Sequence, residues 1–136
     1  MSMARITAGF IGRPYQLGIT DCFSAVLEYI ASCGYQIPDS FEGVTRDDYA
    51  DLFEADPGAA KALMVRFVDR LLDEVPPGHA FAGDILLLRL RGQLPFLAID
   101  GGNGNIIAAS ESRGVGVSPR RSYTTERAWR CRRQSL

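Results

Sequence analysis

The sequence predicts an α+β domain, because helical patterns fill its first half and strand patterns its second half. Between residues 23 and 75, apolar side chains recur every three or four residues, as on one face of a helix. After Gly83-Asp84 the pattern changes to short apolar runs separated by glycine and asparagine, which is typical of strands. Helices first and strands second favour an α+β arrangement. The 136 residues are predicted to form a single domain over 1–136, with a helical part at 1–78 and a sheet part at 79–133.

The first predicted helix begins at a cysteine. Its apolar positions follow helical spacing: Phe23, Val26, Leu27, Ile30 and Ala31. Asp21 or Thr20 is suited to cap its start, and Gly34 followed by Pro38 is suited to end it. Cys22 therefore lies in the first turn, where the helix dipole and unpaired backbone N–H groups favour a thiolate. The alternative is that Cys22 is simply a small buried side chain.

Further helices are predicted over residues 45–75. Thr45 and Asp48 have the spacing of a capping box before a short helix, and Asp56-Pro57 begins a longer one. The apolar stripe of the longer helix consists of Ala60, Leu63, Met64, Phe67, Val68, Leu71, Leu72 and Val75. Pro76-Pro77-Gly78 is expected to end it.

The second half predicts an antiparallel sheet of about five strands. The expected strands are 85–90, 94–99, 105–110, a short one around 115–117 and a last one at 128–132. Asp100-Gly-Gly-Asn-Gly104 is expected to form a hairpin turn. In the last strand, Trp129 and Cys131 should share one face and the arginines the other.

Composition excludes several classes of protein. Three cysteines and one histidine provide neither a disulfide framework nor the spacing of a metal site, so no metal and no cofactor is expected. No apolar stretch approaches the roughly 18 residues of a membrane span, and no signal peptide is recognised. Arginines gather near the C-terminus, but without a nucleic-acid motif, so neither nucleic acid nor membrane is an expected partner. The chain is expected to be made in the cytoplasm.

The order of motifs resembles the NlpC-type cell-wall peptidases, which are papain-like cysteine enzymes acting on peptidoglycan stem peptides and include versions carried in bacteriophage tails. The resemblance rests on residues 12–22 (GRPYQLGITDC), on Gly83-Asp84 before an apolar strand, and on the hairpin at 97–110. It implies an NlpC-like domain in which the helix carrying Cys22 packs on the sheet and 45–75 is a helical insertion. By the same resemblance, Cys22 is the nucleophile, and Tyr15, Gly18 and Asp21 lie near it in the cleft.

The catalytic positions of that family are altered here. The resemblance places its histidine base at Phe96 and its orienting polar residue at Ala108, and neither of these side chains can accept a proton. Phe23 stands where a small serine is usual. The one histidine, His79, lies in the loop after Pro77 and would have to act as the base from a different direction.

Three interpretations stay open. The first is a catalytically degenerate NlpC-like protein that is a structural or binding component of a phage or phage-like tail tip, with other tail or assembly proteins as partners. The second is an active cysteine hydrolase of peptidoglycan stem peptides, using Cys22 with His79 as base. The third is a small cytosolic binding module with an Arg-rich C-terminal docking surface.

Overall fold

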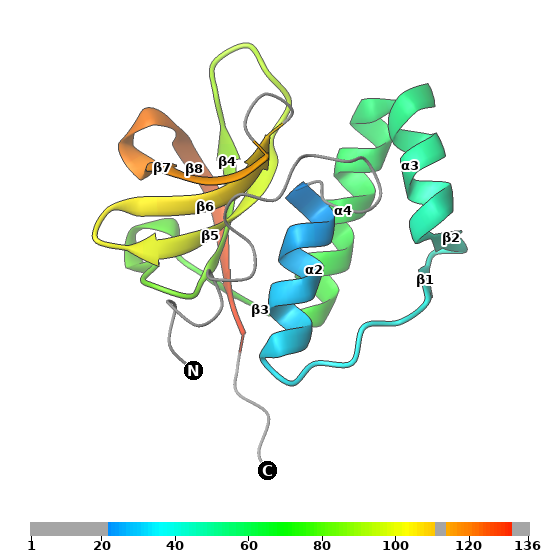
Figure 1. The fold of residues 1–136 in the computed structure, drawn as a ribbon, viewed down its shortest axis with the longest axis horizontal. Helices are drawn as coiled ribbons and strands as arrows, with labels where there is room; N and C mark the ends of the chain where they lie inside the picture. The colour runs from blue at the N-terminus through cyan, green and yellow to red at the C-terminus, as the bar shows by residue number, and fades with distance from the viewer. Residues whose placement is uncertain (1–21, 111–113, 132–136) are drawn as a thin grey trace.

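A six-stranded antiparallel sheet forms one layer of the computed structural model, which describes residues 22–110 and 114–131 (Figure 1). The strand order is β3-β8-β4-β5-β6-β7. The strands are β3 (Asp73–Val75), β4 (Ile85–Arg89), β5 (Phe96–Gly102), β6 (Asn105–Ser110), β7 (Gly114–Pro119) and β8 (Thr124–Arg130). Strands β4 to β7 form the predicted meander, whereas β8 returns to pair with β4 on its other side. The predicted α+β class is therefore confirmed, with one strand more than expected.

The tightest turn of the meander joins β5 to β6. Only Asn103 and Gly104 separate the two strands, and both have positive φ, +56° and +76°. Two consecutive residues of positive φ are the signature of a type I′ turn, which asparagine and glycine adopt most readily. The predicted hairpin at this position is confirmed.

The helices all lie on one side of the sheet (Figure 1). Helix α2 (Cys22–Ser32) contacts β5 and β6, and α4 (Pro57–Leu71) contacts β3. A two-stranded hairpin, β1 (Ser40–Phe41) and β2 (Val44–Thr45), leads into α3 (Arg46–Ala55), which packs on α4. Residues 40–71, which comprise β1, β2, α3 and α4, are called the helical segment below. Two short 3₁₀ helices, η1 (Pro77–His79) and η2 (Arg120–Ser122), connect strands of the sheet.

The starts of α3 and α4 follow the predicted capping signals. The Thr45 hydroxyl accepts a hydrogen bond from the Asp48 N–H at 3.1 Å, and the Asp48 carboxylate accepts one from the Thr45 N–H at 3.2 Å. Asp56 caps α4 by accepting from the Ala59 N–H at 3.1 Å, with Pro57 at the first helical position. These local signals specified both helix starts correctly.

Helix α4 ends earlier than its apolar stripe predicted. It stops at Leu71, and Asp73–Val75 pairs with β8 as strand β3. Two causes account for the difference. Pro76 pushes the preceding Val75 away from helical backbone angles, and the edge of β8 offers backbone partners that a helix would leave unused. The predicted helix to residue 75 was therefore wrong in its last turn, and β3 arises from the part of the chain predicted to be helical.

Apolar side chains fill both faces of the sheet. The first core cluster lies between helices and sheet and includes the fully buried Val26, Ile30, Met64, Val68 and Trp129. The second core cluster is formed by the alternate strand residues Leu86, Leu88, Ala98, Ile106 and Ala128. In the part of the chain that the structure describes, no helix is long and apolar enough to cross a membrane.

Candidate functional site

Cys22 is the first residue of α2, and its sulfur contacts a cation from the helical segment. The residue is 8% exposed, and its Sγ accepts a hydrogen bond from Nζ of Lys61 at 3.4 Å. Lys61, the only lysine in the chain, lies on α4, and its Nζ is 5.3 Å from the centre of the Phe53 ring on α3. Both helices of the segment thus contribute to the surroundings of the thiol. The sequence marked Cys22 but not Lys61, because no local pattern links positions so far apart.

Phe23 anchors the helical segment on α2. Its ring lies 4.9 Å from that of Tyr49 on α3 and 5.6 Å from that of Phe67 on α4, the latter nearly edge-on. Such tilted and edge-on pairs add to the stabilisation from burial. A large aromatic residue directly after the cysteine is therefore explained by packing, since a small serine there would leave the aromatic cluster without its central ring.

The structure does not bring His79 and Cys22 together. His79 is exposed on η1, and its backbone oxygen accepts from Nη2 of Arg130 at 3.4 Å. Arg130 belongs to β8 and binds the carboxylate of Asp84. The preceding residue, Gly83, contacts α2, because its carbonyl accepts a hydrogen bond from the Tyr29 hydroxyl at 2.8 Å. Tyr29 is two turns from Cys22, or about 10 Å along the helix axis. The contacts of His79 thus lead, through Arg130 and the Gly83-Asp84 turn, to a part of α2 two turns beyond the cysteine.

Phe96 and Ala108 lie close together, as the resemblance implied, on adjacent strands and in the lining of one surface pocket. The Phe96 ring packs edge-on against Tyr123 at 5.2 Å, and Ala108 packs against the second core cluster. Cys22 belongs to the first cluster and does not line this pocket. That these two positions correspond to the catalytic pair of the peptidases stays a prediction. The other three expected cleft residues, Tyr15, Gly18 and Asp21, lie outside the described residues.

Two buried carboxylates hold the sheet together rather than facing the thiol. Asp84, 2% exposed, accepts from Nε and Nη2 of Arg130, both at 3.0 Å, and from the Phe81 N–H at 3.0 Å. Asp100, 5% exposed, accepts from Arg120 at 3.3 Å. Asp84 thus fixes the turn that leads into β4. In the described residues, no three histidine, cysteine or acidic side chains gather in a way that would hold a metal ion.

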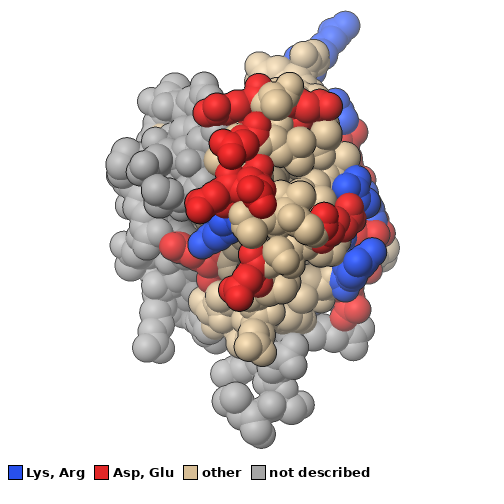
Figure 2. Space-filling model, turned by 90° about the vertical axis from the view of Figure 1, so that its right-hand side faces the viewer, with Lys and Arg blue, Asp and Glu red and all other residues tan. Residues whose placement is uncertain are grey.

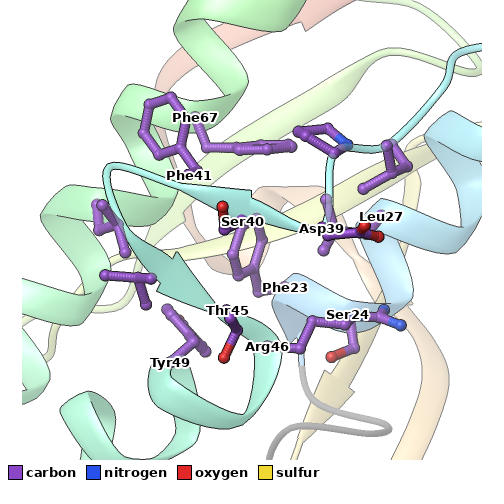
Figure 3. Close-up of a pocket in the computed structure, with 14 residues that line it drawn as sticks. Phe23, Ser24, Leu27, Asp39, Ser40, Phe41, Thr45, Arg46, Tyr49 and Phe67 are labelled. Carbon is purple, nitrogen blue, oxygen red and sulfur yellow. The ribbon is translucent and has the colours of Figure 1, made fainter.

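An apolar pocket lies between α2 and the helical segment, and Phe23, the residue after Cys22, forms part of its wall, whereas Cys22 itself does not (Figure 3). Its wall is mainly aromatic and aliphatic, including Phe23, Phe41, Tyr49 and Phe67, and polar side chains from Ser24, Asp39 and Arg46 line it as well. The helical pattern of the sequence marked Phe23 and Phe67 as residues of apolar helix faces. It did not predict the pocket, because the pocket depends on how the β1–β2 hairpin folds against α2.

The outer face of the helical segment is acidic (Figure 2). The exposed acidic side chains of α3 are Asp47, Asp48, Asp51 and Glu54. Next to them, Glu42 of the hairpin accepts two hydrogen bonds from Arg66 of α4, at 2.8 and 2.9 Å, and this pairing lowers the pKa of the Glu42 carboxyl. The ion pair ties the hairpin to α4 at the edge of the acidic face.

Known proteins resemble this chain at the level of fold and of family. No curated protein matches the chain. A solved structure, the crystal structure of the NlpC/p60 domain of the peptidoglycan hydrolase SagA, aligns with a TM-score of 0.57 and 18% sequence identity, over 94% of this chain and 95% of that one. The predicted papain-like, NlpC-like fold is thereby confirmed. Residues 2–131 match the model of a family described as a domain of unknown function, DUF6950, and the chain belongs to that family.

Proposed function

We propose that this protein is an NlpC/p60-fold protein without peptidase activity, made in the cytoplasm and built into the tail tip of a phage or phage-like particle as a structural or binding component. The observation that carries the loss of activity is that the contact found on the Cys22 sulfur in the described part of the chain comes from Lys61 and not from a histidine. A lysine ammonium has three donors and no acceptor, so in its charged form it cannot take the proton of a thiol.

The rest of the site supports the same proposal. A cysteine peptidase needs a base that takes the thiol proton and later gives it to the leaving amine. Phe96 and Ala108 have no titratable group, and the contacts of His79 in the described part of the chain lead to Arg130 of β8 and not to Cys22. Because the members of a catalytic triad act as a unit, loss of the base removes most of the rate enhancement. The fold is thus retained while the chemistry is not.

A binding role needs the fold and a surface that recognises the partner, but it does not need a catalytic base. The pocket that Phe23 lines offers an aromatic wall with a few polar groups, a composition suited to an apolar side chain of a partner. The tail assignment is supported by the resemblance of the chain to a family that includes versions carried in bacteriophage tails. The pocket has a free volume of about 40 Å³, so a peptidoglycan stem peptide bound without cleavage would have to lie largely outside it.

The tail role is tested on particles. Mass spectrometry of purified phage or phage-like particles from the source culture should detect this chain at a fixed ratio to the tail proteins, and tail genes should neighbour its gene. A Phe41→Ala variant, altered in the wall of the pocket, should be incorporated less well than Glu28→Ala, altered outside that wall. Absence of the chain from the particles would refute the tail role without bearing on the loss of activity.

The Lys61 contact also favours a second candidate, an active cysteine hydrolase of peptidoglycan stem peptides. In this case the uncharged form of Lys61, rather than His79, would serve as base for Cys22, as lysine does in Ser-Lys hydrolases. Hydrolysis would then be lost in Cys22→Ala and Lys61→Ala and kept in His79→Ala. Loss in His79→Ala instead would favour the histidine mechanism.

The contacts of the arginines near the C-terminus do not favour a docking surface for an acidic partner. Arg120 pairs with Asp100, Arg127 with Glu74, and Arg130 with Asp84. These three arginines have acidic partners within the chain, which reduces the charge they would present to an acidic protein, whereas Arg132 and Arg133 lie outside the described residues.

A further inference from the structure

The apolar pocket that Phe23 lines adjoins a second, wider cavity between α2 and the start of α3. This outer cavity has a free volume of about 460 Å³, against about 40 Å³ for the pocket. The pocket and the outer cavity are called the α2–α3 groove below. They have several wall residues in common, namely Leu27, Ile37, Pro38, Asp39, Thr45 and Arg46 (Figure 3). One ligand can therefore occupy both parts.

The apolar end of the α2–α3 groove is small and has firm walls. The rings of Phe23, Tyr49 and Phe67 are buried and contact one another in tilted and edge-on pairs. A water molecule needs about 10–15 Å³ of such free volume, so the pocket has room for about three or four non-hydrogen atoms. This is the size of a valine or leucine side chain, whereas the side chain of phenylalanine or tryptophan is larger. The pocket therefore selects a small aliphatic group.

The outer part of the α2–α3 groove is acidic. Its charged wall residues are Glu28, Asp39 and Asp47 with a single cation, Arg46, and all four are exposed. None of the ion pairs found among the described residues involves Asp39 or Asp47. The acidic face of α3 continues outward from Asp47 (Figure 2). A groove lined mainly by one sign of charge attracts ligands of the opposite sign and disfavours those of the same sign.

We propose that the α2–α3 groove binds a segment of a partner protein in which a valine or leucine is flanked by lysine or arginine. The aliphatic side chain fills the apolar pocket, and the basic side chains lie in the outer part near Asp39 and Asp47. The size of the pocket and the charge of the groove each restrict the partner independently. The inference rests on the binding role proposed above and specifies the chemistry of the partner.

Binding in the α2–α3 groove does not require the thiol of Cys22. Cys22 lines neither part of the groove. Its sulfur contacts Lys61, which does not line the groove either. The Cys22→Ala variant should therefore bind the same segment as tightly as the wild type does.

The test uses synthetic peptides and fluorescence anisotropy with the full chain. The probe is a fluorescein-labelled peptide with two arginines on each side of a central valine. Serine in place of the valine should weaken binding about tenfold, because the buried aliphatic contact is lost. Phenylalanine in its place should also weaken binding, and glutamates in place of the arginines should abolish it. Equal binding of the valine and serine peptides, or tighter binding of the phenylalanine peptide, would overturn the proposal.

Variants of the protein locate the binding site. The double variant Asp39→Asn, Asp47→Asn should bind the valine peptide about three- to tenfold more weakly, because two partners of the arginines are lost. The matched control is Asp51→Asn, Glu54→Gln, which removes two exposed charges of α3 outside the groove and should bind as the wild type does. Asp39→Asn alone lies outside every helix and should still weaken binding if the double variant is misfolded. Equal losses in the two double variants would show unspecific attraction and contradict the proposal.

Light scattering distinguishes a second copy of the chain from a different partner. We expect a monomer at the concentrations used for the peptide titrations. A dimer that dissociates in the Asp39→Asn, Asp47→Asn variant and does not bind the peptide would overturn the proposal and assign the groove to self-association. Failure of the peptide tests would leave the tail role standing, since that role is judged by the presence of the chain in particles. Absence from particles would likewise leave the peptide specificity standing.

Discussion

The sheet and the helical segment are built by different means. In the sheet, buried aliphatic side chains fill both faces, and the buried charges are fixed by arginines, as at Asp84 and Asp100. In the helical segment, the core is aromatic and its ion pair, Glu42 with Arg66, is on the surface. The fold resemblance to an NlpC/p60 domain extends over 94% of the chain, yet the group that contacts the Cys22 sulfur is a lysine of the helical segment that the resemblance did not imply. A retained fold therefore does not determine the chemistry at Cys22, because the residue that contacts its sulfur, Lys61, comes from another segment.

The largest expected effect tests whether the helical segment is a packed layer or a loose lid. Phe67 is 5% exposed and contacts the rings of Phe23 and Phe41. Phe67→Ala should lower the free energy of unfolding by about 3–5 kcal/mol in urea denaturation, because a large buried side chain leaves a cavity. Leu71→Ala, on the same helix but only half-buried, should cost about 1–2 kcal/mol. Equal and small effects in both variants would show that the segment packs loosely.

The next effect tests the buried charges of the sheet. Asp84→Ala removes the acceptor of three hydrogen bonds, two of them from the Arg130 guanidinium. We expect a loss of about 2–4 kcal/mol in the free energy of unfolding, since hydrogen bonds to charged groups are among the stronger ones. The control is Glu42→Ala in the exposed pair with Arg66, which should change stability little. If Asp84→Ala unfolds at the same urea concentration as the wild type, the contrast between the two regions fails.

A smaller effect concerns pH and the Cys33 thiol. Its pKa is lowered from 9.0 to about 6 in the folded protein, so between these pH values the unfolded state binds more protons than the folded one. This lowered pKa therefore contributes stability above pH 9 that declines as the pH falls and is lost below about 6. Under reducing conditions, the wild type should gain stability relative to Cys33→Ser as the pH rises from 6 to 9. A difference that does not change with pH would show that Cys33 is not ionised in the fold.

Local signals in the sequence predicted local structure well. Thr45 with Asp48, Asp56 with Pro57, and Asn103 with Gly104 each specify their own backbone geometry through short-range hydrogen bonds or positive φ. The apolar stripe of α4 was also recognised, although its last turn became β3 because β8 supplied a backbone partner.

The candidate site was predicted only in part, since it depends on contacts between distant segments. Cys22 was identified from its place at a helix start. Its partner Lys61 comes from a helix much later in the chain, and neither residue carries a mark of the other.

The central claim, a peptidase fold whose cysteine has lost its base, is tested most directly by a hydrolysis time course. Purified wild-type protein and Cys22→Ala are incubated with muropeptides that carry intact stem peptides, and the products are separated by liquid chromatography with mass detection. We predict no cleavage of the stem peptide by the wild type above the level of Cys22→Ala, while iodoacetamide still labels Cys22 slowly near neutral pH. Cleaved stem peptides that appear with the wild type and vanish with Cys22→Ala would contradict the claim.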